Sequence, residues 1–79
     1  MDNDKILTNI FCKIFKIDKG KILNVNFNKK NWDSIAHINL ILEIENSFKI
    51  KIDYKIAHKI NSFKKTKKIL SKFYNINFS

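Results

Sequence analysis

Residues 32–48 read WDSIAHINLILEIENSF, and this segment decides the fold of the chain. From Ser34 onward its apolar side chains cover well over half of a helical circumference, which predicts a helix over residues 34–48. Asp33 precedes Ser34 at the start of this helix, and the Ser34 hydroxyl is expected to lie exposed at the helix N-terminus. The alternative is that Ser34 serves only as the N-cap and that Asp33 is a favourable charge at the helix start. A helix that is apolar on more than one face lies centrally in a small domain or offers part of its surface to a partner or ligand.

Two further long helices are predicted from the same kind of pattern. Residues 4–16 repeat apolar side chains at helical period, and Asp2 or Asp4 can cap the start. The apolar face of this helix consists of Ile6, Leu7, Ile10, Phe11, Ile14 and Phe15. Residues 63–74 form a last helix that Ser62 can cap. Its predicted inward side chains are Phe63, Ile69, Leu70 and Phe73, and its outward ones are Lys64, Lys65, Lys67, Lys68 and Lys72.

The segment between the first two helices, residues 17–33, has two interpretations. Leu23, Val25 and Phe27 alternate with asparagines, which fits either a strand or a long loop whose apolar side chains contact the core. Gly20 is the only glycine and suits a chain reversal after the first helix. The local pattern leaves the strand and the loop open.

The C-terminal half contains one more expected helix. Residues 48–54 alternate apolar and polar side chains, but a connector is preferred to a strand. It leads into a short helix over about residues 54–60, which Asp53 caps, and residues 75–79 are expected to fray. These patterns together predict one all-α domain over residues 1–79. It is a small four-helix bundle of three longer helices and one short helix, with a long loop between the first two.

Length and composition exclude several classes of protein. A chain of 79 residues with one cysteine forms no internal disulfide, and its sequence shows no Cys/His cluster with metal-ligand spacing. No apolar run is long enough to span a bilayer and the first residues lack a secretory pattern, so a cytoplasmic protein is expected. Cys12 is expected to be an idle surface thiol, His37 and His58 to be surface residues, and Trp32 to pack against its neighbours.

The charge of the chain is strongly positive and uneven. All sixteen basic residues are lysines, and the formal net charge is +9. Residues 35–53 hold two lysines against three acidic side chains, whereas residues 54–79 hold seven lysines and no acidic side chain. The lysine-rich surface expected from residues 54–79 can attract nucleic acid or an anionic membrane. Because the sequence lacks arginine and any recognised nucleic-acid motif, no specific nucleic-acid partner is expected, while weak membrane attraction stays open.

Two motifs on the second predicted helix resemble the signature of the acyl carrier protein family. Asp33-Ser34-Ile35 resembles the Asp-Ser-Leu of that family, and Glu45-x-x-Phe48-x-Ile50 matches the ending of its second helix. The order of helices and the long first loop are also similar, so the resemblance covers essentially the whole chain.

The resemblance implies post-translational chemistry at Ser34. A phosphopantetheinyl transferase, using its own Mg²⁺, would move 4′-phosphopantetheine from coenzyme A to the Ser34 hydroxyl, with Asp33 in support. The arm would then hold acyl or aminoacyl groups as thioesters, so the chain is expected to be a monomeric carrier and not an enzyme. The resemblance places Leu40, Ile44 and Phe48 mainly in the core. The residues expected to face the arm or a partner are Ile35, Ile38, Leu42 and Glu45.

The surface around the attachment site departs from the family. Acidic side chains usual on the second helix are replaced by Ala36, Asn39 and Asn46, which leaves Glu45 and Glu43. The third helix is reversed in sign, with Lys55, His58 and Lys59. Because like charges across an interface lower affinity and association rate, dedicated loading and transfer enzymes of a specialised biosynthetic pathway are expected as partners. Two alternatives remain, namely a basic helical module for nucleic acid or anionic membranes, and an unmodified interaction subunit.

Overall fold

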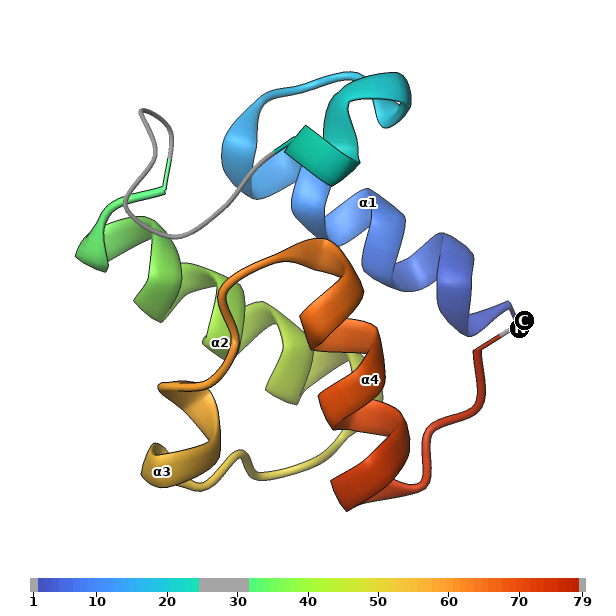
Figure 1. Ribbon diagram of the computed structural model, residues 1–79, viewed down its shortest axis with the longest axis vertical. Coiled ribbons are helices and arrows are strands. Elements are labelled where there is room, and N and C mark those ends of the chain that lie inside the picture. The colour runs from blue at the N-terminus through green and yellow to red at the C-terminus, as the bar shows by residue number, and fades with distance from the viewer. Residues whose placement is uncertain (1, 25–31, 79) are drawn as a thin grey trace.

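The computed structural model describes residues 2–24 and 32–78, which form four α-helices and one short 3₁₀ helix (Figure 1). Within these residues there is no β-strand, so the predicted all-α fold is confirmed. The elements in chain order are α1 (Asn3–Phe15), η1 (Lys19–Asn24), α2 (Ser34–Phe48), α3 (Tyr54–Ala57) and α4 (Phe63–Tyr74). None of these helices combines the length and apolar character needed to cross a membrane.

The start of each long helix is set by the side chain just before it. Asp2 accepts a hydrogen bond from the Asp4 amide, Asp33 from the Ala36 amide, and Ser62 from the Lys65 amide. These bonds satisfy amides that have no partner inside the helix. The predicted bounds of α2 and α4 are therefore confirmed residue for residue, while α3 is shorter than predicted and continues as turns up to Ile60.

A group of aromatic rings forms the centre of the core beneath α2. Trp32 is fully buried, and its ring centroid lies 4.7 Å from that of Phe15 and 5.7 Å from that of Phe11. Phe11 also meets Phe63 of α4 edge to face at 5.1 Å. Leu40 and Ile44 of α2 complete the centre with no exposed surface, as the sequence predicts, whereas Phe48 is half-buried. Trp32 thus packs, and it joins α1 to the start of α2.

The chain after α4 is packed against the core, so the predicted fraying is wrong for its described residues. Ile76 is buried, the Asn77 carbonyl accepts a hydrogen bond from Asn3 Nδ2 at 2.9 Å, and Phe78 meets Phe48 edge to face. Asn3, near the start of the chain, consequently lies beside Asn77, near its end. A buried apolar side chain and a long-range hydrogen bond hold this tail against the core. Local sequence cannot indicate such contacts.

Three single-residue predictions are wrong. Phe73, predicted inward, is 45% exposed, because in the last turn of α4 the next side chain, Tyr74, packs against the core instead. Cys12, predicted as a surface thiol, is half-buried against the core. The reversal after α1 is made by Lys16 in the left-handed conformation (φ 54°) and not by Gly20, which lies in η1.

The ambiguous first loop is partly described. The backbone of Leu23 lies in η1, so it is 3₁₀-helical and not extended. Val25 and Phe27 lie outside the described residues. Ile22 of η1 is buried, and η1 contacts both α1 and α4.

Candidate functional site

The Ser34 hydroxyl is exposed at the first residue of α2. Asp33 Oδ1 caps the helix by accepting from the Ala36 amide at 2.9 Å, so the serine is not used as the cap. Within the described residues, the Ser34 hydroxyl and the amides of Ser34 and Ile35 have no hydrogen-bond partner. Free amides and the helix dipole make this position favourable for an anion.

Asp33→Ala is expected to lower the free energy of unfolding by about 1 kcal/mol, because the Ala36 amide loses its acceptor. Asp33→Asn keeps an acceptor oxygen at the cap and is expected to retain most of the stability. Urea denaturation followed by circular dichroism measures both variants. Equal losses in the alanine and asparagine variants would show that the cap is not what Asp33 contributes.

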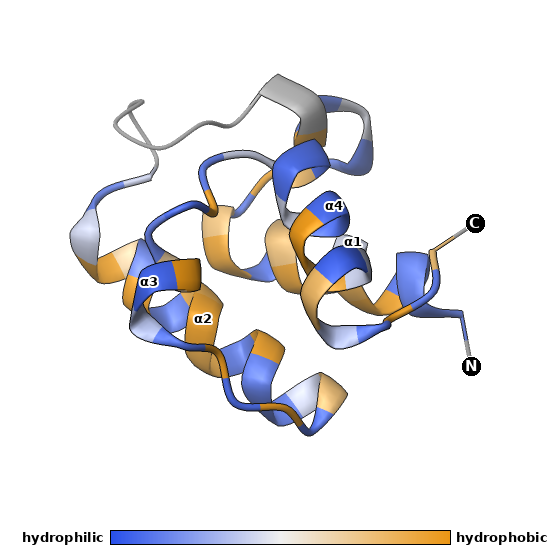
Figure 2. Cartoon of the chain, turned by 60° about the horizontal axis from the view of Figure 1, so that its bottom comes forward, coloured by the Kyte–Doolittle hydropathy of each residue, from blue (hydrophilic) through white to orange (hydrophobic). Residues whose placement is uncertain are grey.

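An apolar cavity of about 450 Å³ opens beside Ser34 between α2 and α3. Most of its lining is aliphatic or aromatic, and Ser34 and two histidines supply the polar part. The lining residues are Ser34, His37, Ile38, Ile41, Leu42, Ile52, Tyr54, Ala57, His58 and Ile60. Figure 2 shows the hydrophobic colour on both α2 and α3 where they lie next to one another.

The apolar residues assigned to this surface are unusually exposed. Ile35 is 71% exposed, Ile38 58% and Leu42 51%, although all three belong to the most apolar helix of the chain. Ile38 and Leu42 line the cavity, while Ile35 lies next to Ser34 in sequence but outside the lining. Tyr54 of α3 adds a fourth exposed side chain on the opposite wall, at 75%. Exposed apolar side chains gathered around one opening are typical of a surface that meets a ligand or partner.

His37 holds the two walls of the cavity together and is not the surface residue that the sequence predicts. Its Nδ1 accepts from the Trp32 indole N–H at 3.0 Å, and its Nε2 lies 2.9 Å from the Ala57 carbonyl. The indole can only donate and the carbonyl can only accept, which fixes the imidazole as an Nδ1 acceptor and an Nε2–H donor. With both nitrogens bonded in this way, His37 is a positioning residue and not a base for Ser34.

Glu45 has a structural contact that sequence reasoning missed. Its Oε2 accepts from the Ile52 amide at 2.7 Å, which ties α2 to the connector that leads into α3. Glu45 is half-buried and lies outside the cavity lining, so it does not face the opening beside Ser34. The signal in the sequence was the same Glu45-x-x-Phe48-x-Ile50 motif, whose glutamate stabilises the turn after the helix.

The carboxylates of this region are engaged within the molecule, while its lysines project into solvent. The four contacts are Asp33 with the Ala36 amide, Glu43 with Lys13 Nζ, Glu45 with the Ile52 amide, and Asp53 with the Lys55 amide. The exposed lysines are Lys49, Lys51, Lys55 and Lys59. Asp33 and Asp53 are exposed as well, so both signs of charge are accessible in this region. In residues 2–24 and 32–78, no three His, Cys, Asp or Glu side chains gather as a metal site.

No protein-family model matches this chain, and the search for related characterised proteins found none.

Proposed function

We propose that this protein is a carrier of the acyl carrier type, with 4′-phosphopantetheine attached to Ser34. One observation supports the proposal above all others, namely that the exposed Ser34 hydroxyl lies at the mouth of an apolar cavity. A helix N-terminus alone would indicate an anion site, and a cavity alone would indicate an apolar ligand. Their juxtaposition suits a phosphate-linked arm that carries an apolar cargo.

The residues at this position fit such an arm. The free amides of Ser34 and Ile35 are suited to the phosphodiester, because the cap uses the amide of Ala36 instead. The exposed side chains of Ile38 and Leu42 give the arm and its cargo apolar surface at the opening. A volume of about 450 Å³ lies within the usual range for small-molecule sites, about 300–1,000 Å³. When attached, the arm supplies a thiol that holds acyl or aminoacyl groups as thioesters.

The proposal names partners as well as a cofactor. A phosphopantetheinyl transferase modifies Ser34, and dedicated enzymes load and unload the arm in a specialised biosynthetic pathway. The docking surfaces of these enzymes are expected to complement the exposed lysines and apolar side chains of this region. Enzymes that serve the acidic carriers of the family complement acidic side chains instead. Since coenzyme A is the donor, we place the protein in the cytoplasm, and we propose that it acts as a monomer.

The test is the intact mass of the protein after incubation with coenzyme A, Mg²⁺ and a broad-specificity phosphopantetheinyl transferase. The parent protein is expected to gain one phosphopantetheine, and Ser34→Ala none. Ser34 follows the capping residue, and its hydroxyl makes no hydrogen bond to any residue that the structure describes, so its alanine variant is expected to keep its fold. Ser47→Ala is the matched control, because Ser47 is exposed on the same helix but lies near its other end.

Two results would overturn the proposal. If Ser34→Ala gains the same mass as the parent, the arm is attached elsewhere. If the parent gains none while a known carrier is modified in the same mixture, the chain is better described as an unmodified interaction subunit with a carrier-like fold.

A further inference from the structure

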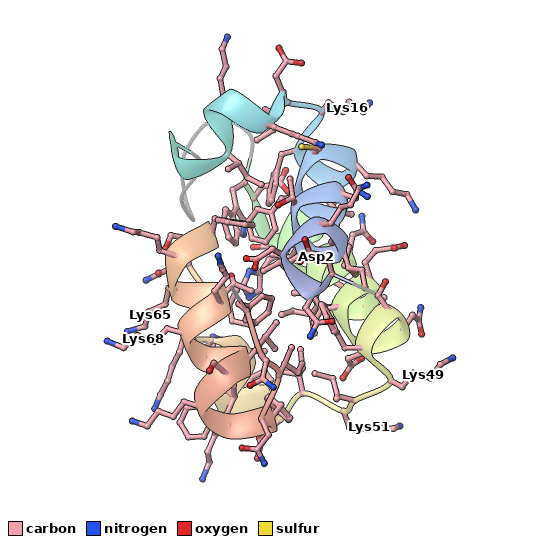
Figure 3. The ribbon with its side chains drawn as sticks, turned by 90° about the vertical axis from the view of Figure 1, so that its right-hand side faces the viewer. Asp2, Lys16, Lys49, Lys51, Lys65 and Lys68 are labelled. Atoms are coloured by element: carbon pink, nitrogen blue, oxygen red, sulfur yellow. The ribbon has the colours of Figure 1, made fainter. Side chains whose placement is uncertain are left out.

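A row of lysines on the outer side of α4 has no role in the proposed site. Lys65, Lys68 and Lys72 recur at intervals of three and four residues, so they lie on successive turns of one side of the helix. All three are exposed, and Figure 3 shows Lys65 and Lys68 projecting together away from α4. Within the described residues the only ion pair made by an α4 lysine joins Lys67 to Asp4. The charge of the row is thus left for an external partner.

An exposed aromatic ring adjoins this row. Phe73 is 45% exposed, and the ammonium groups of Lys72 and Lys59 lie 5.5 and 6.0 Å from its ring centroid. Lys59 therefore extends the positive surface from α4 to the chain that follows α3. We use the name basic face for Lys59, Lys65, Lys68, Lys72 and Phe73.

We propose that the basic face binds the surface of an anionic lipid bilayer. Lysine ammonium groups are attracted to anionic headgroups, and an exposed apolar ring beside them can enter the boundary between headgroups and acyl chains. No acidic side chain occurs after Asp53, so nothing in this part of the chain opposes the approach of a negative surface. The binding is peripheral, because α4 turns its other large apolar side chains, Phe63, Ile69 and Leu70, into the core of the protein.

The surroundings of Phe73 favour a bilayer over single-stranded nucleic acid. Single-stranded nucleic acid is bound by several aromatic rings on which successive bases stack. Here the row of lysines adjoins one exposed ring, and the ammonium groups of Lys59 and Lys72 lie over that ring, where a base would stack. The chain also lacks arginine, which makes the bidentate contacts to bases and phosphates. A bilayer requires neither stacking nor bidentate contacts.

The basic face and the Ser34 cavity do not share residues. The cavity is lined by residues of α2, α3 and their connections, and none of the five members of the basic face belongs to it. Binding to a bilayer is consequently compatible with an accessible Ser34. It does not depend on the modification of that serine.

The experiment measures sedimentation of the protein with vesicles of phosphatidylcholine containing phosphatidylglycerol, and with vesicles of phosphatidylcholine alone, at about 0.1 M salt. The parent is expected to bind only the anionic vesicles. Lys65→Gln with Lys68→Gln is expected to lower the partition coefficient at least about tenfold. The matched control, Lys49→Gln with Lys51→Gln, removes the same charge from exposed lysines on the other side of the molecule (Figure 3). It is expected to change binding by less than about threefold.

Further variants separate the possible partners. Phe73→Gln is expected to weaken vesicle binding several-fold while leaving the weak binding of a single-stranded oligonucleotide unchanged. Ser34→Ala is expected to bind vesicles as the parent does. Equal losses in the two lysine pairs would overturn the proposal in favour of a nonspecific effect of net charge. The proposal would also be overturned if the parent did not bind the anionic vesicles. If the parent bound the oligonucleotide more tightly than the vesicles, and Phe73→Gln abolished that binding, the basic face would be a nucleic-acid surface instead.

Discussion

Trp32→Ala is expected to remove a large part of the free energy of unfolding of this protein. Trp32 is fully buried, contacts the rings of Phe11 and Phe15, and donates its indole N–H to His37. Replacing a buried aromatic side chain with alanine costs about 3–5 kcal/mol, because the lost contacts leave a cavity. A domain of 79 residues has a total stability of about 4–12 kcal/mol, so a large part of it depends on this one side chain.

Urea denaturation measures this prediction, with far-UV circular dichroism as the signal. Fluorescence is unsuitable because Trp32 is the only tryptophan and the variant would lose the probe. Trp32→Phe keeps a ring but loses the N–H, and it is expected to fall between the parent and the alanine variant. Tyr54→Ala is the control, since Tyr54 is 75% exposed. A midpoint for Trp32→Ala equal to that of Tyr54→Ala would contradict the assigned core.

His37→Ala is expected to lower the free energy of unfolding by about 1–3 kcal/mol and to loosen α3. The variant removes the acceptor of the buried Trp32 indole N–H, and leaving a buried donor without its partner carries that cost. It also removes the hydrogen bond to the Ala57 carbonyl, which holds α3 against α2. Since α3 is only four residues long and has no buried side chain, it depends on such contacts.

Hydrogen exchange of the amides of residues 56–60, together with urea denaturation, measures this second effect. Faster exchange is expected there in His37→Ala, and His37→Phe is expected to behave in the same way because its ring lacks both nitrogens. His58→Ala is the control, since His58 is exposed and its described ring contact is with Tyr54. The prediction fails if the His37 and His58 variants lose equal stability or if exchange near α3 is unchanged. Because α3 forms one wall of the cavity beside Ser34, loosening α3 is also expected to open that cavity. The same variants therefore test whether the core contacts of His37 support the proposed site.

Much of the helical structure could be predicted because its signals are local. Asp33 and Ser62 each cap the helix that follows them, and the amide that each satisfies lies three residues away. The exposed side of α2 follows from the width of its apolar surface, which exceeds what one core contact covers. The resemblance, and not the periodicity, implied that Ile38 and Leu42 face the arm, and both side chains are exposed and line the cavity beside Ser34.

The errors share a physical cause, which is contact between residues far apart in the chain. His37 is half-buried because Ala57, twenty residues later, accepts its hydrogen bond. Phe73 fits the inward pattern of α4 but is 45% exposed, with the ammonium groups of Lys59 and Lys72 beside its ring. Periodicity indicates which side of a helix is apolar and not how far the neighbouring elements extend along it.

The sequence by itself determined the helices, their caps, the sign of the charge and the position of Ser34 before an apolar helix, because each depends on residues within a few positions of one another. The tertiary structure decided that α3 stands opposite α2, so that an apolar cavity opens beside Ser34, and that His37 and Glu45 hold these elements in place. It also decided that Phe73 adjoins a row of exposed lysines. These features arise from packing and hydrogen bonds between distant segments, which no local pattern contains.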